Sequence, residues 1–256
     1  MRLTKFSPEM KEFYKTYEKW SDKCWQTTLS SHEKEIQNLS KKQQFFDFWT
    51  DTLSDNPVAV HFFPEIFFDS YMSIQFACMG LYKYAIMCLR SELESTLKMI
   101  YFSDHPVEFN WWVNGVEIDG ITSKKHVWGD GYTYFQNLDN IKLFNSKFND
   151  KSQLINNIKT IYSAYSKYVH TSAKSFQTSQ RNIIPKFDLK DFKGWVAKFE
   201  TTQEYIHVLL ILTYFDKFKL VNSKDRDELI KICVIDSNYN RELKKTIKEL
   251  ILVLSK

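Results

Sequence analysis

Glycine and proline are scarce in this chain, which has six Gly and five Pro among 256 residues. Folds built from many short strands need more turn residues, and a nucleotide-binding loop needs closely spaced glycines. The low content therefore excludes an all-β sandwich and a Gly-rich phosphate loop, and it favours long, uninterrupted helices. Hydrophobic residues make up 43% of the chain, which is enough for a sizeable core and excludes global disorder.

Metal-ligand spacings and long apolar runs are also lacking. No two of the four cysteines stand at zinc-ligand spacing, and the six histidines are scattered, so we expect no metal and no cofactor. The signatures of serine hydrolases and zincins are absent. The longest apolar run, about residues 205–215, is too short to span a bilayer, and no signal-peptide pattern opens the chain. We therefore expect a reduced, cytoplasmic protein that does not contact a membrane.

The hydrophobic periodicity predicts an all-α protein. The expected helices cover residues 8–39, 41–53, 65–79, 82–102, 151–172, 188–220, 224–235 and 238–254. Pro64 should close a short connector over residues 58–63, and Gly80 should separate two helices. We predict one helical domain over residues 1–256, with residues 1–60 as an N-terminal helical extension and residues 61–256 as the core.

Residues 107–150 differ in amino-acid composition from the rest of the chain. They hold four of the six glycines and several aromatic residues. The pair Asn114-Gly115 is typical of a tight β-hairpin turn. We therefore expect an irregular insertion in the core, in which this pair favours a small β-ribbon.

Arginine is the rarer basic residue, with five Arg among 35 Lys and Arg residues. Arg90 falls on the edge of the apolar stripe of its helix, and Glu94 follows one turn later on the same side, whereas Glu92 points to the opposite face. An arginine beside a core needs an anionic partner. Two interpretations stay open: a structural Arg90–Glu94 pair that fixes the helix register, or an arginine that Glu94 orients toward a phosphate.

A polar line runs beside the apolar stripe of the helix expected over residues 151–172. Its members, which span an arc of about 60° of the helix, are Lys159, Ser163, Ser166 and His170. The C-terminal end of a helix favours a charged histidine, which suits proton transfer during phosphoryl transfer. The alternative is a boundary histidine that bonds a backbone carbonyl group.

A basic tract surrounds this histidine. Residues 142–200 contain eleven Lys and Arg but four Asp and Glu, and residues 171–187 contain no acid. Such a segment suits a phosphate backbone, although a solvated loop would have the same composition. The residues that we predict to contact nucleic acid are Lys159, Ser163, Ser166, Lys167, Lys174 and Arg181.

Two short phrases of the sequence resemble the HEPN-like helical families of bacterial defence and abortive-infection systems. They are Tyr-Ala-Ile-Met-Cys-Leu-Arg-Ser-Glu-Leu-Glu, which ends at Glu94, and Tyr-Ser-Lys-Tyr-Val-His-Thr-Ser, which contains His170. The resemblance covers about residues 65–175. It implies an all-α, HEPN-like bundle, a homodimer, and an RNA cleft between protomers that works without metal. His170 would correspond to the motif histidine, and Arg90 would supply the motif arginine from another helix.

The resemblance implies a metal-independent RNA endonuclease that acts as a toxin-like effector in anti-phage defence. Its catalytic residues would be His170, Arg90 and Glu94. The alternative is a non-catalytic helical sensor, scaffold or antitoxin-like subunit of a defence complex. In that case the same three residues would form a structural polar network, and a protein from the same system would be the partner.

Overall fold

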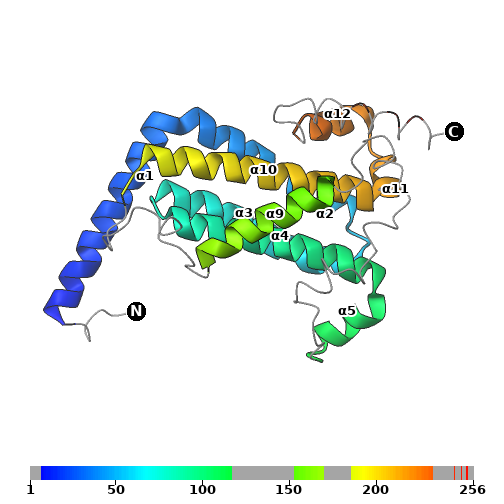
Figure 1. The fold of residues 1–256 in the computed structure, drawn as a ribbon, viewed down its shortest axis with the longest axis horizontal. Coiled ribbons are helices and arrows are strands. Elements are labelled where there is room, and N and C mark those ends of the chain that lie inside the picture. The colour runs from blue at the N-terminus through cyan, green and yellow to red at the C-terminus, as the bar shows by residue number, and fades with distance from the viewer. Residues whose placement is uncertain are drawn as a thin grey trace.

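The computed structural model describes residues 7–116, 153–169 and 186–232, with isolated positions nearer the C-terminus. These ranges are helices and short connections without a strand, which confirms the all-α class. The helices, labelled in Figure 1, are α1 (Pro8–Gln43), α2 (Phe45–Thr52), α3 (Pro57–Cys78), α4 (Tyr82–Asp104), α5 (Pro106–Val113), α9 (Gln153–Val169), α10 (Leu189–Thr213), α11 (Phe215–Phe218) and α12 (Ser223–Ile232).

α4 is the central helix of the described fold. It forms a hairpin with α3 and also contacts α9 and α10. In Figure 1, α9 crosses α4 obliquely, while the first half of α1 projects from the helical body. α1 bends at His32, which has a non-helical φ of −135°, and the last third of the helix then lies against the body. Among the described residues, no helix combines the length and apolarity needed to span a bilayer.

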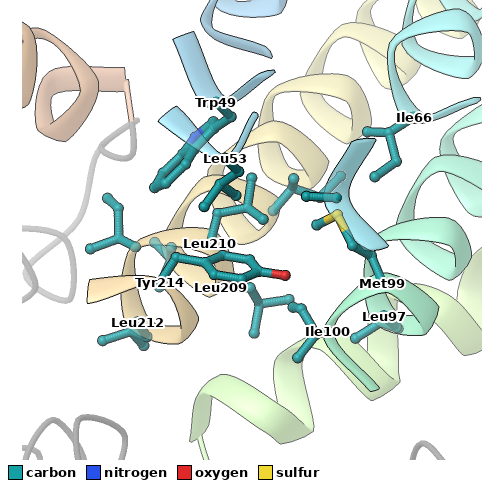
Figure 2. Close-up of a cluster of buried hydrophobic side chains, with 14 of the residues drawn as sticks. Trp49, Leu53, Ile66, Leu97, Met99, Ile100, Leu209, Leu210, Leu212 and Tyr214 are labelled. Carbon is teal, nitrogen blue, oxygen red and sulfur yellow. The ribbon is translucent and has the colours of Figure 1, made fainter. Parts of the chain in front are cut away.

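Two clusters of buried side chains hold the helices together. The larger joins α2, α3, α4 and α10, and Figure 2 shows Trp49, Ile66, Met99 and Leu210 within it. The second lies around Trp195 of α10 and joins that helix to α1, α3, α4 and α9. Burial of each large apolar side chain contributes roughly 1.5–3 kcal/mol, so these clusters supply the main stabilisation of the bundle.

The end of α1 and one face of α2 take part in these clusters, and Ile36 and Leu39 of α1 pack in the second one. Phe46, Trp49 and Leu53 are each less than 2% exposed and pack in the larger cluster. The most exposed part of the N-terminal region is therefore the start of α1, before the buried residues Ser21 and Cys24. The boundary at residue 60 stays a prediction.

Side-chain caps start helices where the sequence predicted them. The Asp188 carboxylate accepts a hydrogen bond from the backbone N–H of Asp191 at 2.9 Å and starts α10. Asn222 accepts one from the backbone N–H of Asp225 at 3.0 Å at the start of α12. Each cap satisfies an N–H group that the first helical turn leaves unpaired. The helix predicted over residues 188–220 is divided at Tyr214 into α10 and α11.

The prediction of a connector over residues 58–63 is wrong, because α3 starts at Pro57 and continues through Pro64. The side chain of Asn56 accepts hydrogen bonds from two backbone N–H groups of the first turn, both at 3.0 Å. Pro64 removes one backbone hydrogen bond inside the helix. Pro64 is exposed, so water can bind the carbonyl group that it leaves unpaired.

The expectation of a β-hairpin at Asn114-Gly115 is also wrong. Residues 106–113 form α5, and the Asn-Gly pair ends that helix. The backbone N–H of Gly115 bonds the Trp112 carbonyl at 3.0 Å, and the N–H of Val116 bonds the Trp111 carbonyl at 2.9 Å. With a φ of +75° at Gly115, this is the Schellman pattern of a helix C-terminus. The predicted insertion beyond residue 116 and the small β-ribbon elsewhere in it lie outside the described residues. Of the helix expected over 238–254, only isolated positions are described.

Gly80 separates α3 from α4, as the sequence predicted. Its φ is +75°, a conformation that side chains disfavour. A Cβ atom at this position would lie 2.7 Å from the backbone oxygen of Lys186. The missing side chain therefore lets the segment that leads into α10 pack directly on the α3–α4 turn.

Candidate functional site

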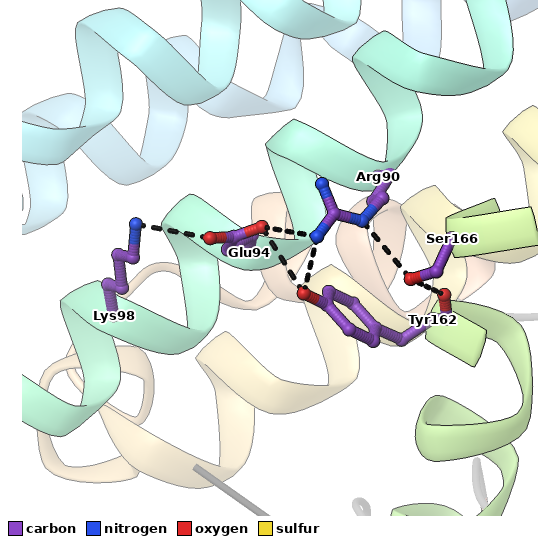
Figure 3. Close-up of polar contacts among 5 residues, drawn as sticks. All are labelled: Arg90, Glu94, Lys98, Tyr162 and Ser166. Atoms are coloured by element: carbon purple, nitrogen blue, oxygen red, sulfur yellow. Dashed lines mark hydrogen bonds and ion pairs between the residues drawn. The ribbon is translucent and has the colours of Figure 1, made fainter. Parts of the chain in front are cut away.

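The side chain of Arg90 connects α4 to α9 (Figure 3). Its Nε donates a hydrogen bond to Ser166 Oγ at 3.2 Å, and its Nη2 donates one to the Tyr162 hydroxyl group at 2.8 Å. Tyr162 and Ser166 are four residues apart on α9, so both face α4. Ser166 in turn donates to the Tyr162 carbonyl group at 2.8 Å, which leaves its oxygen free to accept from Arg90.

Glu94 lies one turn after Arg90 on α4 and completes the cluster. Its Oε2 is 3.3 Å from Arg90 Nη2 and accepts a hydrogen bond from the Tyr162 hydroxyl group at 3.3 Å. Its Oε1 is 3.2 Å from Lys98 Nζ (Figure 3). The two side chains that the sequence places on one helix face therefore form an ion pair, and Tyr162 joins this pair to α9.

The cluster lies at the boundary between core and solvent. The side chains of Arg90 and Glu94 are 24% and 26% exposed, whereas Tyr162 and Ser166 are buried. Burial raises the pKa of Tyr162, the Glu94 carboxylate raises it further, and Arg90 acts in the opposite direction. The phenol therefore keeps its proton at neutral pH and remains a donor to Glu94.

One nitrogen of the guanidinium group is left for another partner. Nε and Nη2 are bonded to protein groups, but within the described residues Arg90 Nη1 makes no hydrogen bond (Figure 3). Arg90 Cζ also lies 5.0 Å from the centroid of the Tyr162 ring, within cation–π range. A guanidinium group held in this way has a fixed orientation, and its planar set of donors matches the oxygens of a phosphate.

The other predicted site residues have different positions. On α9, Ser163 and Lys167 are exposed and Lys159 is half-buried. Ser166 is buried and bonded to Arg90, so its oxygen serves the cluster. His170, Lys174 and Arg181 lie outside the described residues. The catalytic and nucleic-acid-binding roles of all these residues stay predictions.

Sequence reasoning missed the role of Tyr162. Its spacing along the helix assigned it to the apolar stripe of α9, and its ring does pack in the core. Its hydroxyl group, however, bonds both members of the Arg90–Glu94 pair. A tyrosine one turn before a serine, beside a polar line, is the local signal that could have indicated this contact.

A second polar network lies on the opposite face of α4, where the sequence oriented Glu92 but did not indicate its burial. Glu92 is fully buried, and its Oε1 accepts a hydrogen bond from Gln203 Nε2 at 2.7 Å. Gln203 Nε2 also lies 3.2 Å from Ser70 Oγ of α3. Burial raises the pKa of Glu92 well above its ordinary value, and the charge of Asp69 adds to this. The network therefore connects α3, α4 and α10 inside the core.

Neither comparison with known proteins nor the grouping of possible metal ligands identifies a function for the described site. No family model, no curated protein and no solved structure matches this chain. Within the part of the chain that the structure describes, no three His, Cys, Asp or Glu side chains are grouped as a metal site. The chemical character of the site therefore rests on the Arg90 cluster itself.

Proposed function

We propose that this protein is a metal-independent RNA endonuclease whose active site is built around Arg90. The proposal rests on one observation: Arg90 is held at Nε and Nη2 by side chains, while its Nη1 has no partner within the described residues. The side chain is also partly exposed. A guanidinium group fixed in advance stabilises charge on a phosphate without reorganising during the reaction. Glu94 is the residue that orients it.

RNA suits this chemistry because its 2′-hydroxyl group is an internal nucleophile. The step forms the 2′-O–P bond, breaks the P–O5′ bond, and yields a 2′,3′-cyclic phosphate and a 5′-hydroxyl group. A proton leaves the 2′-hydroxyl group, and a proton reaches the 5′-oxygen. We assign proton transfer to His170, which follows the last residue of α9, and charge stabilisation to Arg90.

The resemblance to HEPN-like families supports the wider proposal. It suggests a toxin-like effector of bacterial defence, with a homodimer or a partner from the same system. In this proposal Lys159, Ser163 and Lys167 bind the RNA next to the scissile bond, and the segment that contains Lys174 and Arg181 binds the flanking backbone.

A non-catalytic helical module is the second candidate, and the bonding of the cluster favours it. Arg90 and Glu94 bond each other and also Tyr162, Ser166 and Lys98. A polar network of this kind specifies the packing of α4 against α9. The protein would then act as a sensor, scaffold or antitoxin-like subunit.

Cleavage of end-labelled RNA in excess chelator separates the two candidates. The wild type should yield 2′,3′-cyclic phosphate ends. Arg90→Lys keeps the charge but loses the planar set of donors, and should slow cleavage by roughly 100-fold or more while the protein stays folded. His170→Ala should also abolish cleavage. Arg226→Lys is the matched control, because Arg226 bonds the Lys219 carbonyl group on a distant helix.

Intact RNA after incubation with folded wild type, alone and in a cell extract, would overturn the nuclease proposal. So would cleavage that falls only in proportion to the folded fraction of the Arg90 variant. Either result would support the non-catalytic module, in which the cluster acts through packing alone.

A further inference from the structure

A row of lysines on the projecting half of α1 belongs to neither polar network. Lys15, Lys19 and Lys23 are exposed and follow one another at intervals of four residues. Each interval corresponds to about 6 Å along the helix and a turn of about 40°, so the three side chains line one side of α1. Within the described residues, none of these three lysines forms an ion pair. Three positive charges are therefore available to a ligand.

Trp20 lies beside this row and is 38% exposed. Lys23 Nζ is 5.6 Å from the centroid of a Trp20 ring, a cation–π contact that holds the indole next to the lysines. The lysines, Trp20, Thr16 and Glu12 line a shallow hollow on the surface of α1. Glu12 and Asp22 lie within or beside the same arc of the helix, and their charges partly offset those of the lysines. A phosphate path would therefore run from one ammonium group to the next along the row from Lys15 to Lys23.

This combination has the chemistry of a single-strand binder. Regularly spaced ammonium groups attract consecutive phosphates, and an exposed aromatic ring provides a surface on which a base can stack. Bases inside a duplex are covered by their neighbours, so the indole distinguishes a single strand from a double one. The first half of α1 projects from the helical body, which gives a strand access along the row (Figure 1).

We propose that Lys15, Lys19, Lys23 and Trp20 form a binding site for single-stranded nucleic acid on α1. Phosphates contact the three ammonium groups, and one base stacks on the indole. The site lies on a different helix from Arg90 and takes no part in bond cleavage. The inference therefore goes beyond the proposed nuclease activity and does not depend on it.

Binding of a labelled oligodeoxynucleotide of about 16 nucleotides to the full-length protein tests this site by fluorescence anisotropy. DNA lacks the 2′-hydroxyl group, so the result is independent of cleavage. The triple variant K15Q/K19Q/K23Q should weaken binding more than about tenfold. It should also reduce the slope of log affinity against log salt by about 2, because each phosphate contact on a single strand contributes about 0.7.

The matched control K34Q/K41Q/K224Q removes the same charge from other exposed positions and should leave the slope unchanged. Trp20→Ala should weaken binding roughly fivefold or more with the slope preserved, because stacking is insensitive to salt. An equal loss of binding affinity in the test and control triple variants would refute the assignment of the binding site to this row of lysines. Binding of a duplex as tightly as the single strand would overturn its assignment to single strands.

Discussion

Protonation of His207 should couple the stability of the core to pH. This histidine of α10 is fully buried against Phe46, and its Nδ1 accepts a hydrogen bond from Trp49 Nε1 at 3.2 Å. The neutral ring therefore carries its proton on Nε2. Protonation of Nδ1 would place a charge in the core and remove the acceptor of Trp49. Burial lowers the pKa of His207 to about 3. A hydrogen bond with the Lys42 backbone raises this pKa, whereas the charge of the Lys42 side chain lowers it.

The size of the effect follows from the two titrations. In the unfolded chain a histidine titrates near pH 6.5, so between pH 6.5 and about 3 the unfolded state binds a proton that the folded state does not. The contribution of the neutral His207 ring to the free energy of unfolding is therefore fully present above pH 6.5. It is lost progressively as the pH falls below that value. Each pH unit corresponds to about 1.4 kcal/mol, so the loss at about pH 4.5 is about 3 kcal/mol.

Urea unfolding of His207→Gln and of the wild type, each at about pH 7.5 and 4.5, measures this loss as a difference. The variant keeps an acceptor oxygen but cannot be protonated, and at the higher pH it should be less stable by roughly 1–3 kcal/mol. That gap should shrink by about 3 kcal/mol at the lower pH. His61→Gln, at an exposed position of α3, is the control. A gap that stays constant with pH would refute the claim that the core keeps His207 neutral.

Three further predictions concern the backbone and the polar networks. Gly80→Ala should lower the free energy of unfolding by more than about 2 kcal/mol, because its Cβ would meet the Lys186 oxygen. Gly115 has the same φ but open space around it, so Gly115→Ala should lower the free energy of unfolding by about 1 kcal/mol. Equal losses in urea unfolding would contradict the close approach at Gly80. Glu92→Gln should raise the Tm at pH 8 more than at about pH 4, because a raised folded-state pKa means that stability is lost as the pH rises above about 4.5. A difference in Tm that is independent of pH would contradict this. Tyr162→Phe removes a hydroxyl group that joins α4 to α9 and should cost about 1 kcal/mol in urea unfolding, whereas an unchanged midpoint would show that the group contributes nothing.

Much of the helical order was predictable because helix ends depend on local chemistry. Asp188 and Asn222 cap their own helices, and Gly80 ends α3 through its own φ. The errors arose where one local signal serves two structures. The Asn-Gly pair at residues 114–115 suits a hairpin and a helix C-terminus equally, and its place directly after the helix that starts at Pro106 decided the outcome. Pro64 stays inside α3 because the packed helix tolerates one lost hydrogen bond at an exposed position.

The candidate site was predictable within one helix and not between helices. The four-residue spacing of Arg90 and Glu94 placed them on one face, where they form an ion pair. Their partners Tyr162 and Ser166 lie about 70 residues away, and no local pattern encodes which face of α9 meets α4. The lysine row of α1 was missed for another reason. Its helix has nearly balanced charge, so only the four-residue spacing of the lysines beside Trp20 reveals it.

The two polar networks on α4 have a joint consequence for the site. Arg90 and Glu92 are two residues apart and therefore point in opposite directions, one to α9 and the other to Gln203 of α10. A shift of α4 by one residue would turn it by about 100° and move it by about 1.5 Å, which would break both networks at once. The Glu92 network therefore favours the same register of α4 as the one in which Arg90 meets Tyr162 and Ser166. Substitution of Gln203, which touches no part of the proposed active site, should therefore impair any phosphate contact that Arg90 makes.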